Sequence, residues 1–193
     1  AAELLEQVGL PPAMAARYPH ELSGGQARRV CVARALALNP ALVIADEPTA
    51  GLDVSVQGEI LNLMADLKTR LGLSFLVISH NLSMVRHVTD RIAILYLGRL
   101  VEIGPTSAVF AKPLHPYTQS LIASEPQPDP RKRRADLGIK GEIPSVLRRP
   151  KGCEFHTRCT IAVERCHHEP PKLRELAPQR FVRCHLAPPP EPA

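Results

Sequence analysis

Two short apolar runs, separated by a stretch with helical periodicity, form the clearest pattern in the chain. The run ALVIA covers residues 41–45 and stops at acidic residues, and SFLVIS covers residues 74–79 and stops at His80. Continuous apolar runs of this length are typical of buried parallel strands. Between them, apolar residues recur at the spacing of one helix face, at Val56, Ile60, Met64, Leu67 and Leu71. The pattern predicts a β-α-β unit with a right-handed crossover.

Further elements are predicted on either side of this unit. Ser23 and Gln26 have the spacing of a capping box, which predicts a helix through Arg28–Leu38 that Asn39-Pro40 ends. The later elements are a short helix around residues 83–87 and a hairpin whose strands cover residues 92–96 and 100–103. The fold class we expect is α/β, with a parallel sheet and a β appendage.

The character of the chain changes in its second half. Fifteen of the 20 prolines lie at or after Pro105, and the stretch EPQPDPRKRR follows Ser124. Such a stretch indicates a linker with a solvated basic run. We therefore expect two domains, residues 1–124 and residues 125–193, of which the second is small and irregular. The terminal APPPEPA is expected to be extended or disordered.

Composition excludes several classes of protein. Aromatic residues make up only 4% of the chain, which argues against a surface that stacks bases, so no nucleic-acid partner is expected. No window approaches the ~20 consecutive apolar residues of a membrane span. The first residues, AAELLEQVGL, lack the basic and apolar regions of a signal peptide. We therefore expect the five cysteines to be reduced.

Polar residues suited to phosphate chemistry stand at three places. In LSGGQ, residues 22–26, two glycines leave the amides of a helix start bare, which suits an anion, although an ordinary N-cap has the same pattern. Asp46 and Glu47 follow the first strand, at the sheet edge where open α/β sheets bind ligands. Asp46 can hold Mg²⁺, and Glu47 can polarise a water. His80 follows the second strand and can stabilise a γ-phosphate. Solvated acids and a structural histidine remain the alternative.

In this order and spacing, LSGGQ, a strand with DEP, GLD and a strand ending in SH resemble the ATP-binding cassette (ABC) ATPases, from the first residue to about Gly104. The resemblance implies a P-loop NTPase-like fold with ATP and Mg²⁺ as cofactors. It implies that Asp46 binds Mg²⁺, that Glu47 and His80 are catalytic, and that Asp53 belongs to the D-loop. The signature motif, implied to bind ATP held by the opposite subunit, comprises Leu22, Ser23, Gly24, Gly25 and Gln26.

The resemblance has one departure. No G-x-x-x-x-G-K-[ST] phosphate loop occurs in these residues, so the chain looks like the C-terminal portion of a cassette. We expect the isolated chain to show no ATPase activity, and its sheet to expose apolar surface because neighbouring strands are missing.

A narrower resemblance covers nearly the whole chain. DEPTAGLDVSVQGEIL, GPTSAVF and KPLHPYTQSLIAS are similar to the ATP-binding subunits of bacterial oligopeptide/dipeptide/nickel importers. This implies a peripheral location on the cytoplasmic face of the bacterial membrane. It implies a second ABC ATPase subunit, identical or different, two transmembrane permease subunits and, indirectly, an extracytoplasmic solute-binding protein. Two alternatives stay open: a soluble ABC-type ATPase acting on DNA or ribosomes, and a non-catalytic remnant.

Four cysteines cluster near the C-terminus with the spacing C-x5-C-x6-C-x17-C, at Cys153, Cys159, Cys166 and Cys184. This spacing matches neither the close pairs of zinc modules nor the ferredoxin pattern. Four thiolates nevertheless suffice for a tetrahedral metal site, with free thiols as the alternative. The importer resemblance implies a [4Fe–4S] cluster here, with zinc as the alternative. Cys31 is expected to be a small buried residue outside this set.

Overall fold

The structure, a computed structural model, describes residues 1–125, 139 and 141–188. The chain divides into two compact units, Ala1–Asn81 and Leu82–Ala193. Most of the expected linker at residues 125–134 and of the APPPEPA tail lies outside the described residues. The domain boundary expected after Ser124 therefore stays a prediction.

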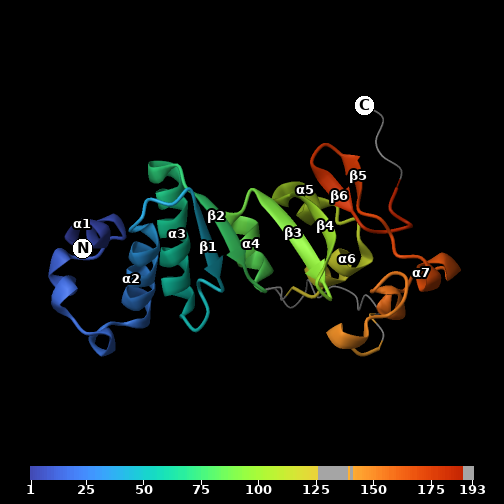
Figure 1. Cartoon of the computed structure of the whole chain (residues 1–193), viewed down its shortest axis with the longest axis horizontal. Helices are drawn as coiled ribbons and strands as arrows, with labels where there is room; N and C mark the ends of the chain where they lie inside the picture. Colours follow the sequence, from blue (N-terminus) through green and yellow to red (C-terminus); the bar gives the residue numbers. More distant parts are fainter. Residues whose placement is uncertain (126–138, 140, 189–193) are drawn as a thin grey trace, which may run out of the picture. The chain divides into compact units, whose positions relative to one another are not determined.

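The first unit contains a two-stranded parallel sheet with helices packed beside it (Figure 1). The strands β1 and β2 pair from Leu42 opposite Ser74 to Asp46 opposite Ile78, which confirms the predicted β-α-β unit. The elements are α1 (Ala2–Gln7), η1 (Pro12–Ala16), η2 (Pro19–Glu21), α2 (Gly24–Leu36), β1 (Leu42–Asp46), α3 (Val54–Leu71) and β2 (Ser74–Ile78).

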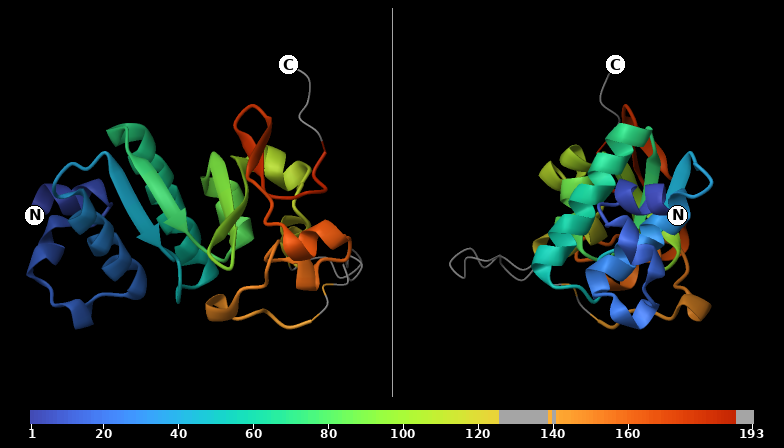
Figure 2. Two further views of the ribbon diagram at one scale, coloured as in Figure 1. Left: turned by 45° about the vertical axis from the view of Figure 1, so that its right-hand side comes forward. Right: turned by 90° about the vertical axis from the view of Figure 1, so that its left-hand side faces the viewer.

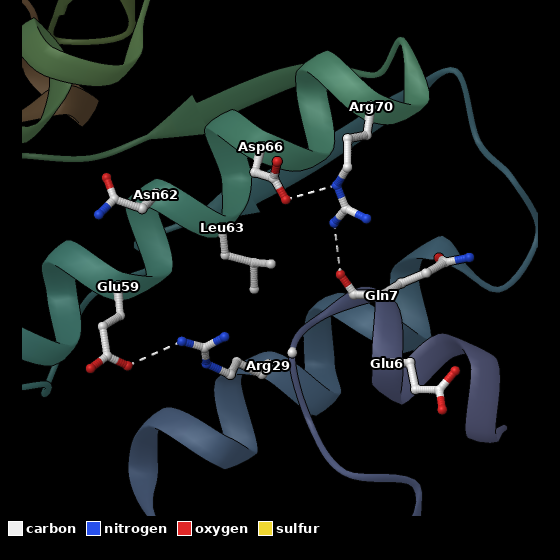
Figure 3. Close-up of a pocket in the computed structure, with 9 residues that line it drawn as sticks. Glu6, Gln7, Arg29, Glu59, Asn62, Leu63, Asp66 and Arg70 are labelled. Carbon is white, nitrogen blue, oxygen red and sulfur yellow. Dashed lines mark hydrogen bonds and ion pairs between the residues drawn. The ribbon is translucent and has the colours of Figure 1, made fainter.

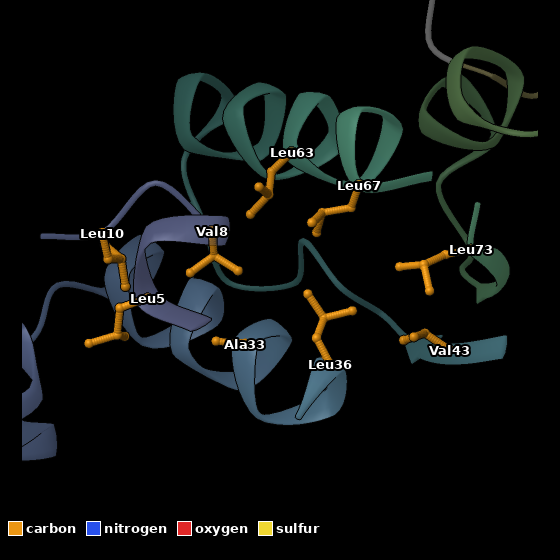
Figure 4. Close-up of a cluster of buried hydrophobic side chains, with 9 residues drawn as sticks. All are labelled: Leu5, Val8, Leu10, Ala33, Leu36, Val43, Leu63, Leu67 and Leu73. Carbon is orange, nitrogen blue, oxygen red and sulfur yellow. The ribbon is translucent and has the colours of Figure 1, made fainter. Parts of the chain in front are cut away.

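The core of this unit lies between three helices and one face of the sheet (Figure 4). Its most buried members are Val8 and Leu67, with no exposed surface, and Leu36, which is 2% exposed. Removing this apolar surface from water supplies the main driving force for folding of the unit. The buried side chains are Leu5, Val8, Leu10, Ala33, Leu36, Val43, Leu63, Leu67 and Leu73.

The outer face of the sheet is exposed. Leu42, Ile44, Leu76 and Ile78 are 50–63% exposed, whereas Val43 points inward and is buried. The interpretation of both strands as fully buried is therefore wrong. In the described part of the chain β1 and β2 pair only with each other, and α3 covers one of their faces. The expected exposed apolar surface is confirmed.

Helix α2 begins as the sequence predicts. The Ser23 hydroxyl accepts a hydrogen bond from the Gln26 amide, and the Gln26 side chain accepts one from the Ser23 amide, completing a capping box. Cys31, however, is exposed rather than buried. It lies two residues from the buried Ala33, and two positions along a helix turn a side chain to nearly the opposite face.

The second unit is built on a four-stranded antiparallel sheet in the order β3-β4-β6-β5 (Figure 2). The predicted hairpin is confirmed as β3 and β4, and the predicted short helix as α4. The elements are α4 (Leu82–Val88), β3 (Arg91–Tyr96), β4 (Arg99–Pro105), α5 (Thr106–Ala111), α6 (Pro116–Ala123), η4 (Val146–Arg148), η5 (His156–Arg158), α7 (Glu164–His168), β5 (Arg174–Ala177) and β6 (Arg180–Val182).

The sequence did not predict that the cysteine-rich segment would join the sheet of the hairpin. Strand β6 pairs with β4, with Glu102 opposite Val182 and Ile103 opposite Phe181. Val182 and Cys184 are buried, beside Leu176 and Ala187. The segment therefore has a small apolar cluster and two strands, and it is not wholly irregular. Among the described residues, no helix has the length and apolarity that a membrane span needs.

A buried ion pair links strand β6 to strand β4 of the hairpin. The Glu102 side chain has no exposed surface, and its Oε1 lies 3.0 Å from Arg180 Nη2. The same carboxylate accepts hydrogen bonds from the amides of Leu114 and His115. Arg180 also donates to the carbonyl oxygens of Ala108 and Lys112. Glu102 thereby receives the partners that a buried charge requires.

The residues HPYT, 115–118, form the start of a helix. Pro116 opens α6, and His115 Nδ1 accepts a hydrogen bond from the Tyr117 amide. Burial lowers the pKa of His115 to about 4, so its ring is neutral near pH 7. The Phe155 ring, 2% exposed, packs edge-on against Tyr96, with ring centroids 5.2 Å apart, and also contacts Tyr117. This aromatic cluster packs the CEFH segment, residues 153–156, against the hairpin.

Candidate active site

The start of α2 offers two backbone donors. Capping and the first helical bond engage the amides of Gln26 and Ala27. In the described part of the chain, the amides of Gly24 and Gly25 are the first-turn donors without a recorded acceptor. Free amides at the positive end of a 13-residue helix favour an anion. The geometry of LSGGQ is thus suited to a phosphate group.

Packing also leaves little room for a side chain at either glycine, and least at Gly25. A Cβ atom at Gly25 would lie 2.7 Å from Val56 Cγ1, and one at Gly24 would lie 3.1 Å from Leu52 Cδ2. These neighbours belong to the loop between β1 and α3 and to the first turn of α3. Arg28 on α2 donates to the carbonyl oxygen of Ala50 in the same loop, at 3.1 Å. The signature segment and the GLD segment are therefore one contiguous surface.

Glu47 and His80 meet at the carboxyl end of the sheet. Glu47 Oε1 lies 2.6 Å from His80 Nδ1 and accepts the His80 backbone amide at 3.0 Å. The Ser79 hydroxyl donates to Glu47 Oε2 at 3.2 Å, a contact that the sequence analysis did not foresee. Glu47 has a φ of +45°, a left-handed backbone conformation that favours glycine.

The hydrogen bonds fix the charge of this carboxylate. The His80 side chain, and to a lesser degree its amide and the Ser79 hydroxyl, lower the pKa of Glu47 below its usual value of 4.5. Glu47 is therefore ionised at neutral pH. Because an ionised carboxylate only accepts, His80 must carry its hydrogen on Nδ1, which leaves Nε2 of an 86% exposed ring available to a ligand.

The two aspartates occupy different positions. Asp46 ends β1 on the exposed side of the sheet, one residue before Glu47. Asp53 caps α3: its Oδ1 accepts the Val56 amide at 3.0 Å and the Ser55 hydroxyl at 2.6 Å. The Ser55 hydrogen bond is the main cause that lowers the pKa of Asp53. The sheet edge thus presents Asp46 beside the Glu47–His80 pair, with Asp53 anchored in the adjacent loop.

One depression on the first unit lies away from these residues (Figure 3). It is open, has a volume of about 650 Å³, and is lined by residues of α1, α2 and α3. Its two arginines are paired, Arg29 with Glu59 at 3.0 Å and Arg70 with Asp66 at 2.7 Å. No residue predicted from the sequence to have a functional role lines it, so it adds nothing to the candidate site.

The four C-terminal cysteines are gathered in one part of the second unit, without a disulfide. The Cys153 amide donates to the Cys166 carbonyl oxygen at 2.9 Å. Burial is the main cause that raises the pKa of Cys153 to about 11, and the nearby thiols of Cys166 and Cys184 act in the same direction. Burial also raises the pKa of Cys159 and of Cys184. Among the described residues, however, no group of three or more side chains is placed to hold a metal ion.

Solved structures identify the class of fold. The ADP conformation of MJ1267, an ATP-binding cassette of an ABC transporter, matches 64% of this chain and 48% of its own, at 30% identity and a TM-score of 0.55. CbiO1 from Clostridium perfringens, part of an ABC transporter complex, matches 57% of this chain and 43% of its own, at 32% identity and a TM-score of 0.53. The fold is therefore part of an ABC ATPase cassette.

Sequence relatives narrow the class. Residues 1–50 match the ABC transporter family model, and residues 101–166 match the C-terminal region of oligopeptide/dipeptide transporters. A probable peptide ABC transporter ATP-binding protein of Sinorhizobium fredii is 51% identical over 98% of this chain and 54% of its own length. The oligopeptide transport ATP-binding protein AppF of Bacillus subtilis is 50% identical over 95% and 56%. The chain belongs to the ATP-binding subunits of the oligopeptide/dipeptide ABC transporter family, and it spans about half the length of these relatives.

Proposed function

We propose that the full-length protein hydrolyses ATP to power the import of peptides through an ABC transporter. The main support for this proposal is the contact between Glu47 and His80 at the carboxyl edge of the sheet. It places a carboxylate and an imidazole ring side by side at the edge where open α/β sheets bind ligands. The peptide cargo is inferred from the relatives, two of which are named for peptide or oligopeptide transport.

The site residues divide the work of hydrolysis. Asp46 holds Mg²⁺, whose preferred ligands are hard oxygens, and the metal supplies charge neutralisation on the phosphates. Glu47 orients and polarises the water that attacks the γ-phosphorus; the bond to the bridging oxygen breaks, and ADP and phosphate are released. His80 stabilises the charge on the transferred group through Nε2. The lowered pKa of Glu47 suits an orienting role near neutral pH better than complete removal of a proton.

The signature segment acts on the nucleotide of a second subunit. The amides of Gly24 and Gly25, with the Ser23 hydroxyl, contact the γ-phosphate, while Leu22 and Gln26 hold the turn. Asp53, fixed as the cap of α3, keeps the neighbouring loop in place at the same interface. The partners are thus a second ABC ATPase subunit and two permease subunits at the cytoplasmic face of the membrane. The proposed domains remain residues 1–124 for the cassette and 125–193 for the extension.

The test compares two forms of the protein. The full-length subunit, assembled with its partner ATPase and permeases in vesicles, is expected to release phosphate and accumulate peptide only when ATP is present. The purified 193-residue chain is expected to release no phosphate above the blank, because it lacks a phosphate loop. Hydrolysis by the isolated chain, or peptide accumulation that is independent of ATP, would be the opposite result.

We further propose that Cys153, Cys159, Cys166 and Cys184 bind a [4Fe–4S] cluster, with zinc as the alternative. The donor set supports this proposal: four free thiols share one region of the second unit, and two of them are buried. The thiols do not converge on one point in the structure, so binding requires them to close around the metal group. The group would act as a cross-link that stabilises the extension.

Metal analysis decides between these alternatives. The full-length subunit, purified without air, is expected to contain iron and acid-labile sulfide, and the Cys153→Ser and Cys166→Ser variants are expected to lose both. Cys31→Ser is the matched control, because Cys31 is an exposed cysteine of the other unit. Zinc without iron and sulfide would show that the site binds zinc and not a cluster. The absence of all three would refute a metal site.

A further inference from the structure

Two aromatic rings form an exposed stack immediately before the signature segment. The rings of Tyr18 and His20 lie with their centroids 5.7 Å apart and their planes at 9°. Tyr18 is 68% exposed, and the chain around it is exposed as well. Burial of a large aromatic ring usually stabilises the fold, and the exposed Tyr18 ring does not make that contribution. The stack is therefore open to solvent in this chain.

The local fold does not need these rings. The turn η2 is closed by backbone groups and by Glu21, whose Oε2 accepts the Tyr18 amide at 2.7 Å. Neither ring belongs to the core cluster of the first unit or to the partly buried side chains that pack against it. Any residue other than proline at position 18 could donate the same amide, so this hydrogen bond does not account for a tyrosine there.

The stack lies close to the proposed phosphate site. Tyr18 and Ser23 are five residues apart, which limits their separation to about 17 Å even for an extended chain, and the turn η2 shortens it. The segment before α2 meets that helix at the same end of the unit as the loop between β1 and α3 (Figures 1 and 2). An extended nucleoside triphosphate is of comparable length, so one molecule can reach from the Gly24 amide to the stack.

We propose that Tyr18 and His20 form the surface that contacts the nucleoside of the ATP whose γ-phosphate meets the signature segment. The inference rests on the proposed function and adds a binding surface to it. A flat aromatic ring can stack on the face of a purine, a contact that discriminates little between bases. His20 supports the Tyr18 ring from one side and adds a ring nitrogen that can hydrogen-bond a ribose hydroxyl. The signature side of the interface would then bind both ends of the nucleotide.

The test measures ATP-driven dimerisation of the full-length subunit with its ATPase partner, identical or different, and uses Glu47→Gln as the parent so that ATP is not consumed. Tyr18→Ala is expected to raise the ATP concentration at half-dimerisation about tenfold in sedimentation velocity experiments. Tyr18→Phe retains the ring and is expected to restore most of the response. Leu38→Ala, which trims a 92% exposed side chain beyond the other end of α2, is the control and is expected to match the parent.

A kinetic measurement separates nucleoside contact from a displaced signature segment. With Glu47 intact, Tyr18→Ala is expected to raise KM for ATP about tenfold and to keep kcat within about twofold, whereas a displaced segment would lower kcat. His20→Ala replaces Tyr18→Ala if circular dichroism shows that the latter is unfolded. Unchanged half-dimerisation and KM in Tyr18→Ala would overturn the inference. A parent that associates in ATP neither with itself nor with its partner ATPase subunit would instead refute the proposed function, and the inference with it.

Discussion

Replacing Glu47 with glutamine in the full-length subunit is expected to lower kcat for ATP hydrolysis by about 10²–10⁴-fold. Glutamine keeps the size of the side chain but removes the charge that polarises the attacking water. It also changes the contact with His80, because an amide oxygen is a weaker acceptor for the Nδ1 hydrogen than the carboxylate 2.6 Å away. Phosphate release at saturating ATP measures the effect, with peptide uptake by the reconstituted transporter as a second readout.

A glutamate outside the candidate site provides the control for Glu47→Gln. Glu59→Gln removes an exposed carboxylate of α3 that pairs with Arg29, and it is expected to leave kcat unchanged, because exposed ion pairs contribute little. Binding of ATP to the Glu47→Gln variant should persist, since the carboxylate is proposed to act on the water and not on the nucleotide. A Glu47→Gln variant with kcat within about threefold of wild type would contradict the assignment of this residue.

The same contacts set the pH dependence that Glu47 can cause. Hydrogen bonds from His80 and Ser79 hold the pKa of Glu47 below 4.5, so the carboxylate stays ionised above that value and is protonated only as the pH falls through its lowered pKa. Any decline of kcat between neutral and mildly acidic pH must therefore come from another group. The Glu47→Gln variant should retain that decline, scaled down with its rate.

Replacing Arg180 with alanine is expected to destabilise the second unit by about 3–5 kcal/mol. The substitution leaves Glu102, which has no exposed surface, as a buried charge without its cationic partner. It also removes donors to the carbonyl oxygens of Ala108 and Lys112, which lie before the HPYT helix. Urea unfolding of the full-length subunit, followed by circular dichroism, should show an earlier transition for the second unit.

An exposed ion pair on the same unit provides the comparison. Arg165→Ala breaks the contact between Arg165 and Glu169, whose side chains are 62% and 58% exposed, and is expected to cost less than about 1 kcal/mol. The double variant Glu102→Gln with Arg180→Met should recover part of the loss, because it removes both buried charges. Equal effects of Arg180→Ala and Arg165→Ala would show that the buried pair has no special role.

The elements that the sequence predicted are those whose signals are local. The Ser23–Gln26 spacing predicted the start of α2, and apolar periodicity predicted α3 between two parallel strands. Strands β5 and β6 were missed because their short sequences, RELA and RFV, contain no apolar run. They form where β6 meets the edge of β4 and Arg180 reaches Glu102, 78 positions earlier, and such distant pairing leaves no periodic pattern.

The candidate site, too, could be predicted only in part. The rule that parallel strands end at one sheet edge was enough to expect Glu47 and His80 near each other. The contribution of Ser79 to Glu47, and that of Arg28 to Ala50, depend on backbone geometry that residue spacing does not specify. Exposure of the outer sheet face followed from the absence of neighbouring strands, whereas exposure of Cys31 depended on which face of α2 meets the core.

The aromatic cluster around Phe155 gives this protein an intrinsic optical signal. The chain has no tryptophan and only three tyrosines. Two of them, Tyr96 and Tyr117, lie with ring centroids 4.7 Å apart and share Phe155 as a neighbour, whereas Tyr18 is exposed. Near-ultraviolet dichroism of the 193-residue chain should therefore report mainly on whether the CEFH segment is seated against the hairpin. Docking of the cysteine-rich segment can thus be followed without an attached label.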